Sequence, residues 1–272
     1  MSSSKHKKSL LWQFRMPEME QPSFLFGTMH VKDQRAFRYQ QQVYECIRQC
    51  DAFALEFDLR EADAGATANM MDLPAGMSLQ SLLRPKHYKK LRKIFKKSTG
   101  IDLAFFNHSQ PILITNLLTE SILSSDKAIV LDHQLWQYAS QLEKLTLGIE
   151  SFEEQMQILQ QISIEDQLKS LVSAAKNFKR FRHQILRMTD LYAEGNIQKL
   201  HKSARKSLKG MRRLMLYDRN ERMAERIALL AGEQSICVAI GAGHLAGKKG
   251  VLSLLKQRGA CLRPIPLSPA DN

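Results

Sequence analysis

The tetrapeptide Gly-x-x-His occurs near both ends of the chain, each time directly after an apolar run. The first copy is Gly27-Thr-Met-His30, and the second is Gly241-Ala-Gly-His244. Each pattern predicts a short buried strand that enters a glycine-started turn and carries one imidazole at its carboxyl end. In open α/β sheets, ligands bind at that edge. Two distant histidines placed in this way predict one site built from both ends of the chain.

Carboxylates end the next expected strand, which covers residues 52–58. Glu56 and Asp58 are two residues apart and therefore share one face of a strand. Burying an unpaired carboxylate is costly, so such residues form a salt bridge, cap a helix or build a site. Together with two imidazoles, they could hold a divalent transition metal with open positions for water. The same groups could work without metal as a general base and its orienting partner, and spacing does not choose between these alternatives.

Three further polar residues are candidates, each with a structural alternative. Arg219 is either an exposed helix residue or a planar cation that clamps a substrate carboxylate or stabilises an oxyanion. Glu150 ends a strand expected over 144–150, and it is either stabilised by the dipole of the following helix or orients a histidine. Asp132 is interpreted as a helix cap or a polar brace rather than as a catalyst.

The order of elements around the two motifs repeats. A helix over 35–50 and the strand over 52–58 follow His30, while a helix over 251–258 and a strand over 260–265 follow His244. This recurrence predicts an α/β fold in which duplicated strand–GxxH–helix–strand halves, residues 1–72 and 231–272, form a central sheet. Residues 73–230 are predicted as a mostly helical insertion that acts as a lid over the strand ends. The whole chain, 1–272, is then a single domain.

Composition limits the class of protein and indicates a charged partner. A hydrophobic content of 44% suffices for a sizeable core. No apolar run reaches the roughly 20 residues of a membrane span, and no secretory signal is evident, so we expect a cytoplasmic protein. The formal net charge is +13, and basic residues gather at 84–97, 176–183 and 199–213. These basic segments are expected to be helical, and they form either a solvated helix face or a surface that attracts an acidic partner. Nucleic acid is the less favoured partner.

Motifs along nearly the whole chain resemble those of TraB/GumN-type proteins, which are related to PrgY, the Tiki proteases and the erythromycin esterases. The matching segments are residues 10–12, 22–31, 54–58, 131–132, 148–150, 154–155, 218–220, 241–247 and 250–259. The resemblance implies an α/β core with the site at the strand ends. It implies metal-dependent, peptidase-like hydrolysis in the Tiki branch, and a metal-free histidine and glutamate in the esterase branch. Family membership does not fix the substrate.

These observations predict a hydrolase that cleaves a peptide or a small ester bond. His30, Glu56 and His244 form its centre and bind a divalent transition metal (Mn, Co or Zn) where one is present, and Arg219 holds developing negative charge. The supporting residues are Asp58, Glu150, Asn220 and Asp132, and the turn glycines are Gly27 and Gly241. The competing hypothesis is a non-enzymatic protein that holds a peptide or a cofactor in the same pocket. Nucleic-acid binding through the basic helices is a third, and the sequence does not indicate an oligomeric state.

Overall fold

Six strands form one mixed sheet in the computed structural model of the chain, which describes residues 9–61 and 71–268. The strands are β1 (Leu11–Arg15), β2 (Ser23–Thr28), β3 (Ala52–Phe57), β4 (Leu145–Glu150), β5 (Ile236–Gly241) and β6 (Cys261–Pro264). Their order across the sheet is β4-β3-β5-β2-β1-β6. The predicted α/β class is therefore confirmed.

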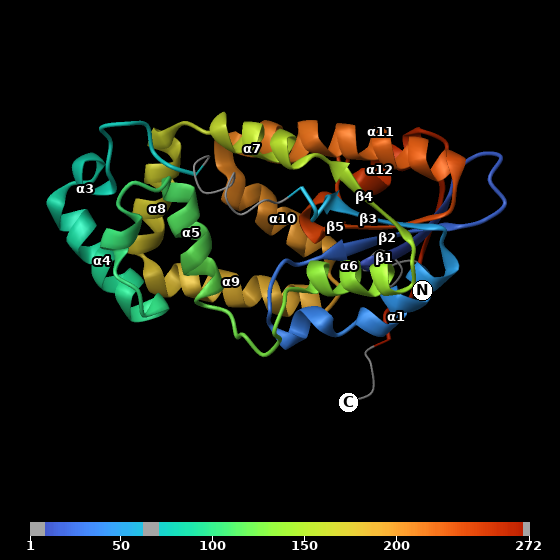
Figure 1. The fold of residues 1–272 in the computed structure, drawn as a ribbon, viewed down its shortest axis with the longest axis horizontal. Helices are drawn as coiled ribbons and strands as arrows, with labels where there is room; N and C mark the ends of the chain where they lie inside the picture. Colours follow the sequence, from blue (N-terminus) through green and yellow to red (C-terminus); the bar gives the residue numbers. More distant parts are fainter. Residues whose placement is uncertain (1–8, 62–70, 269–272) are drawn as a thin grey trace. The chain divides into compact units, whose positions relative to one another are not determined.

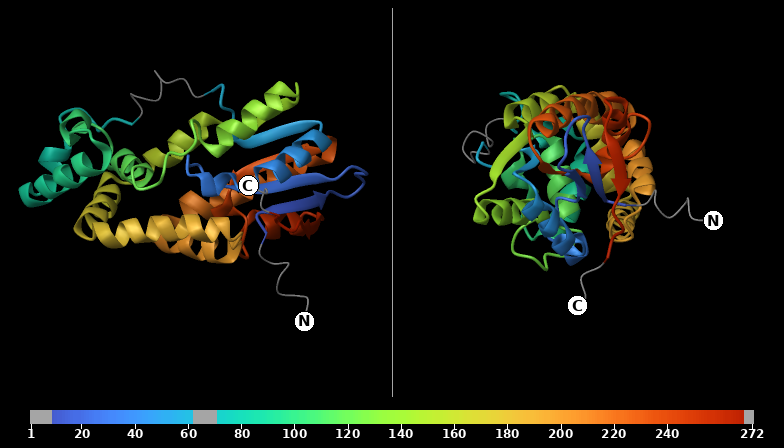
Figure 2. Two further views of the ribbon diagram at one scale, coloured as in Figure 1. Left: turned by 90° about the horizontal axis from the view of Figure 1, so that it is seen from below. Right: turned by 90° about the vertical axis from the view of Figure 1, so that its right-hand side faces the viewer.

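Four neighbouring strands run in the same direction. β4, β3, β5 and β2 pair in parallel, while β1 is antiparallel to both β2 and β6. Figure 2 shows the blue strands β1 and β2 side by side and the red strand β6 next to them. The carboxyl ends of β2, β3, β4 and β5 consequently lie along one edge, with Thr28 paired to Gly241. Both predicted histidine turns leave the sheet at this edge.

Helices cover both faces of the sheet. α1 (Gln40–Gln49) and α6 (Leu131–Gln141) pack together on one face, and α11 (Asp218–Glu233) and α12 (Val251–Gln257) pack together on the other (Figure 1). The interior strands β2 and β5 are apolar runs whose residues are almost all buried, as expected for parallel strands covered on both sides. Short helical turns complete this part: η1 (Gln34–Phe37), η3 (Lys209–Met211), the π-helix η4 (Arg213–Tyr217), η5 (Ala242–His244) and the longer α10 (Ile197–Leu208).

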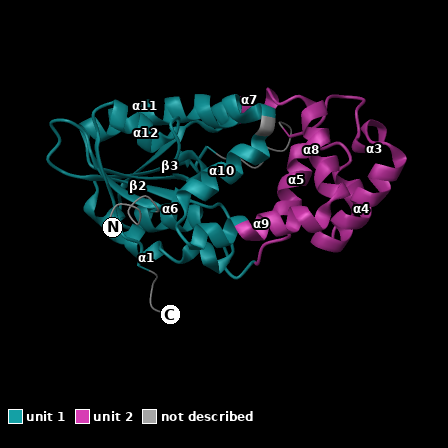
Figure 3. Cartoon of the chain, turned by 180° about the vertical axis from the view of Figure 1, so that it is seen from behind, with its two compact units in different colours: residues 1–61, 125–155, 188–272 teal, residues 62–124, 156–187 magenta. Residues whose placement is uncertain are grey.

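The chain divides into two compact units, shown in two colours in Figure 3. The first consists of residues 1–61, 125–155 and 188–272 and contains the sheet; the second consists of 62–124 and 156–187. The second unit has its own apolar core, centred on Leu91, Phe95 and Ile114. It contains α3 (Leu79–Leu82), α4 (Pro85–Thr99), η2 (Leu103–Phe106), α5 (Pro111–Glu120) and α8 (Ile164–Lys176), and the division falls within α7 (Phe152–Gln160) and α9 (Phe178–Ala193). Within the described ranges, no helix combines the length and apolarity needed to cross a membrane.

The predicted duplication and lid are only partly reflected in this topology. Strand, Gly-x-x-His, helix and strand do follow one another at both ends, but β3 pairs with β5 whereas β6 pairs with β1. The predicted insertion, 73–230, is not one block, because β4 belongs to the sheet and residues 125–155 and 188–230 belong to the sheet-containing unit. The duplicated origin of the halves and the lid function stay predictions.

Candidate active site at the strand ends

Glu56 lies near the end of β3 and turns its carboxylate toward the end of the neighbouring strand β5. Its Oε1 atom accepts a hydrogen bond from the backbone N–H of Gly241 at 2.7 Å. A Cβ atom on residue 241 would lie only 2.9 Å from the same oxygen. Gly241 was predicted to start a turn, yet its φ is −53°, which any residue adopts. The structure therefore requires glycine here for close approach of a carboxylate and not for backbone freedom.

His244 ends η5, directly after β5, and its ring is held in one tautomer. Nδ1 lies 2.6 Å from Oδ1 of Asn220, while Nδ2 of Asn220 donates to the carbonyl of Lys249 at 2.6 Å. Because that carbonyl can only accept, the amide orientation is fixed, and Nδ1 of His244 must donate. Nε2 is then the unprotonated ring nitrogen, and it lies 3.9 Å from Oε1 of Glu56.

The charges at this pair follow from its surroundings. The pKa of His244 is lowered to about 4: burial is the largest cause, the Glu56 carboxylate opposes it, and the Arg219 and His201 side chains add to the lowering. Burial alone would raise the pKa of Glu56, but the Arg219 guanidinium, His244 and the Gly241 N–H together bring it down to about 2. At neutral pH a neutral imidazole therefore faces an ionised carboxylate.

Arg219 joins the ends of β3 and β4. Its Nε donates to Glu150 at 3.0 Å, and Nη2 donates both to Glu150 and, at 2.8 Å, to Glu56. Glu150 is almost fully buried, so the expectation that it orients a histidine gives way to a buried pair with arginine. Nη1 of Arg219 makes no hydrogen bond to the described residues, and this nitrogen is not fully buried. This nitrogen therefore keeps access to solvent.

Arg219 and Asn220 reach different partners from consecutive positions in the first turn of α11. The π-helix η4 immediately precedes this turn. Both side chains are buried, Asn220 completely. Single π-turns occur often at functional sites, where they shift the direction of the residues that follow. One short segment thus supplies the cation for Glu56 and the amide for His244.

His30 forms a second histidine–carboxylate pair, two residues beyond the end of β2. Its Nδ1 lies 3.4 Å from Oδ2 of Asp132, and Oδ1 of Asp132 accepts the hydroxyl hydrogen of Thr28 at 2.9 Å. Oδ2 is buried and accepts no hydrogen bond from the described residues, so the 3.4 Å contact is ionic when His30 is protonated. The His30 side chain is 56% exposed and lies edge-on to His133. The two motif histidines follow the neighbouring strands β2 and β5, and each has its own carboxylate partner: Asp132 of α6 for His30 and Glu56 of β3 for His244.

The donor set fits a metal ion at one pair. Nε2 of His244 and Oε1 of Glu56 are 3.9 Å apart. One metal ion could bind both atoms, because two metal–ligand bonds of about 2.1 Å span at most about 4.2 Å. Among the described residues, no three His, Cys, Asp or Glu side chains are grouped to hold an ion. The predicted third ligand, His30, is placed beside Asp132 instead. The structure therefore presents two facing donors and not a preassembled three-ligand centre.

Two other predicted positions have different surroundings from those expected. The carboxylate of Asp58 binds the guanidinium of Arg60 at 2.6 Å, so the predicted support for the centre is not seen. Gly27 lies inside β2 and does not start the turn; a Cβ there would come within 2.6 Å of the Leu245 side chain. Its requirement is close packing between β2 and the segment that follows β5.

His201 was not predicted, and it supports the loop that carries His244. Its Nδ1 lies 3.0 Å from the carbonyl of Gly243, and the ring is buried. Gly247 has a φ of +96°, and a Cβ there would lie 2.5 Å from Nε2 of His201. The sequence held no usable signal, because the partner is a backbone carbonyl of a distant segment.

The fold and site define an α/β protein whose buried histidine, carboxylates and arginine converge where parallel strands end. The sequence profile of the TraB/PrgY/gumN family matches residues 10–264, and the chain belongs to this family. Metalloprotease TIKI2 of Danio rerio is 28% identical to it over 94% of the chain and 61% of that protein. Metalloprotease TIKI1 of Homo sapiens is 26% identical over 92% of the chain and 61% of that protein. The chain thus spans less than two thirds of these relatives, and no solved structure matches it.

Proposed function

We propose that this chain is a hydrolase that cleaves a peptide or ester bond beside the ends of β3 and β5. The relationship between His244 and Glu56 carries the proposal, because two electron-pair donors face each other across 3.9 Å. Such a pair is satisfied by a hydrogen-bond donor or a cation between them. A water held between these two groups would be placed to act as the nucleophile that hydrolysis requires, and a metal ion held by the same groups would make that water more acidic.

The surroundings favour metal-dependent hydrolysis over a metal-free reaction. A general base works best when its pKa is near the operating pH, whereas His244 and Glu56 have pKa values of about 4 and about 2. A neutral histidine whose second nitrogen donates to a carbonyl is in the state that binds metal. His244 and Glu56 would hold a divalent transition metal, whereas the predicted third ligand, His30, lies beside Asp132. Such an ion would supply a water whose pKa is lowered to about 7.

Arg219 supplies positive charge for the negative oxygen that develops as the substrate carbonyl is attacked. Glu56 and Glu150 fix two of its nitrogens, so the guanidinium is positioned before substrate binds. Nη1 is left to donate to the oxyanion. Removing one such preorganised donor reduces kcat by about 100- to 1000-fold in well-studied hydrolases.

A peptide is the preferred substrate class, because the relatives are named metalloproteases. An ester is the second class, since water attack on either carbonyl develops the same oxyanion. Neither class calls for an additional cofactor. The predicted substrate chemistry is therefore hydrolysis of an acyl bond.

The test is an activity screen on the purified protein loaded with Zn²⁺, Mn²⁺ or Co²⁺. Peptide libraries are analysed by mass spectrometry, and chromogenic esters by absorbance. We expect turnover that a chelator abolishes, that metal restores, and that His244→Ala and Glu56→Gln each remove. His183→Ala, an exposed histidine in the second unit, is the matched control and should keep full activity.

Two results would contradict the proposal. Turnover that survives both substitutions would move the chemistry elsewhere. Tight capture of intact peptide with no turnover would instead support the non-enzymatic binding hypothesis. His30→Ala tests whether the metal is bound by His244 and Glu56 alone or also by His30. Loss of metal affinity in this variant would identify His30 as the third ligand.

A further inference from the structure

The second unit carries most of the excess positive charge of the protein. Residues 71–124 and 156–187 contain fourteen Lys and Arg but only five Asp and Glu, which accounts for nine of the thirteen excess charges. Three of these five carboxylates are already paired: Asp102 with Arg92, and Glu165 and Asp166 with Lys169. Twelve cations of this unit are therefore left without a carboxylate of their own among the described residues.

The lysines of α4 form a continuous exposed face. Lys86, Lys89, Lys90, Lys93, Lys96 and Lys97 are all exposed, whereas Leu91 and Phe95 on the opposite side are buried. α4 contains no acidic residue. Repulsion between lysines three and four residues apart destabilises a helix, so this arrangement does not serve the stability of α4.

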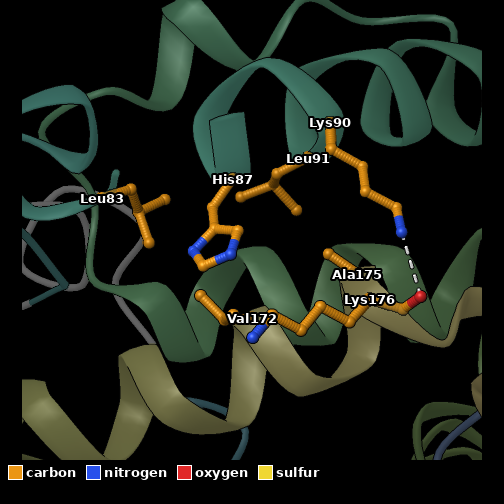
Figure 4. Close-up of a pocket in the computed structure, with 7 residues that line it drawn as sticks. All are labelled: Leu83, His87, Lys90, Leu91, Val172, Ala175 and Lys176. Atoms are coloured by element: carbon orange, nitrogen blue, oxygen red, sulfur yellow. Dashed lines mark hydrogen bonds between the residues drawn. The ribbon is translucent and has the colours of Figure 1, made fainter. Parts of the chain in front are cut away.

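Further cations meet this face at the end of α8. Nζ of Lys90 donates to the carbonyl of Lys176 at 3.0 Å (Figure 4). Partial desolvation lowers the pKa of His87, and repulsion from Lys176, Arg84, Lys86 and Lys90 lowers it further. Figure 4 shows His87, Lys90 and Lys176 among the residues that line one pocket. We call Lys176 and the lysines of α4 the basic face.

Exposed apolar side chains follow directly after the last lysines of α4. Phe105 is 83% exposed and Ile101 is 47% exposed, and both come within a few residues of Lys96 and Lys97. The pairing of Arg92 with Asp102 holds their segment along α4. A solvent-exposed phenylalanine and an exposed aliphatic residue in the segment that follows a lysine-rich helix are the combination found where proteins enter a lipid interface.

We propose that the basic face of the second unit binds the surface of a bilayer rich in anionic lipids, with Phe105 and Ile101 entering the headgroup region. Lysines near an anionic membrane each add attraction that falls off within a Debye length. Nucleic acid is the less suitable partner, because single strands bind through several stacking aromatics, whereas the large exposed apolar side chains that follow α4 are one phenylalanine and one isoleucine. The proposal is independent of the hydrolase site.

The test is co-sedimentation of the full chain with vesicles of phosphatidylcholine alone and with an equimolar mixture of phosphatidylcholine and phosphatidylserine. We expect binding only to the mixed vesicles, weaker at high salt. The triple variant Lys89→Gln, Lys93→Gln and Lys97→Gln should weaken binding about a hundredfold, which corresponds to about fivefold for each lysine. Phe105→Ser should weaken binding and increase its sensitivity to salt.

A matched control removes three exposed lysines from α10 of the first unit: Lys199→Gln, Lys202→Gln and Lys206→Gln. This variant loses the same charge and should bind like the unmodified protein, as should His244→Ala. Equal loss in both triple variants, equal binding to both vesicles, or no binding to either overturns the proposal. Tighter binding to a single-stranded oligonucleotide, dependent on the same α4 lysines, would identify nucleic acid as the partner instead.

Discussion

Oε1 of Glu56 accepts the backbone N–H of Gly241 at 2.7 Å and lies 3.9 Å from Nε2 of His244, so one carboxylate oxygen is near both ends of the turn that follows β5. The contact depends on the pairing of β3 with β5, which places Glu56 beside a strand from the other end of the chain. Arg219 and Asn220 then fix the two partners separately. The site is therefore a set of side chains held by a rigid sheet edge.

Asn220 should control metal affinity without contacting the metal. Asn220→Ala removes the acceptor that orients His244, and loss of such a partner typically costs 10- to 100-fold in affinity. Competition with a chromophoric chelator measures the affinity, and circular dichroism checks the fold. Asn220→Asp keeps an acceptor for Nδ1 and should lose less. Equal affinities for all three proteins would remove Asn220 from the site.

Arg219 should contribute strongly to stability. Arg219→Ala leaves the carboxylates of Glu56 and Glu150 uncompensated, and breaking a buried pair in this way costs about 3–5 kcal/mol. Urea denaturation measures the free energy of unfolding, and adding Glu150→Gln should recover part of the loss. The control is Arg213→Ala, whose exposed pair with Asp218 should contribute only about 0–1 kcal/mol. Similar losses in both single variants would contradict the buried network.

Gly247 and His201 should be coupled. Gly247→Ala puts an alanine at a positive φ, which costs about 1–2 kcal/mol of stability. It also adds a Cβ that meets the His201 ring. Gly100→Ala has a similar φ of +79° with no atom within 4 Å, so it isolates the backbone cost. The midpoint temperature of thermal unfolding should be lower for Gly247→Ala than for Gly100→Ala. Adding His201→Ala should relieve the clash, and failure to do so would show that the ring is not the obstacle.

Glu154 should make stability depend on acidity. The Arg226 guanidinium and the Ser151 N–H lower its pKa from 4.5 to about 2 and outweigh burial, which acts in the opposite direction. The fold thus favours the ionised form, and the contribution is present above about pH 4.5 and lost as pH falls toward 2. Free energies of unfolding of the unmodified protein and Glu154→Gln should differ at neutral pH and converge in acid. A constant difference across this range would exclude ionisation as the cause.

Local patterns predicted much of the fold correctly. The strand expected over 52–58 is β3 (Ala52–Phe57), and the helix expected over 35–50 contains α1 (Gln40–Gln49). The strand expected over 144–150 is β4 (Leu145–Glu150), and the helix expected over 251–258 is α12 (Val251–Gln257). These features depend on neighbours within a few residues, which a sequence displays directly.

The sequence by itself determined which residue types stand at the carboxyl ends of the strands: an imidazole after β2 and near the end of η5, and carboxylates near the ends of β3 and β4. Only the tertiary structure decided their partners. His30 lies beside Asp132, His244 faces Glu56, and Arg219 binds two carboxylates from different strands. Strand order across the sheet sets these contacts, and it depends on packing between segments far apart in the chain, which local spacing does not encode.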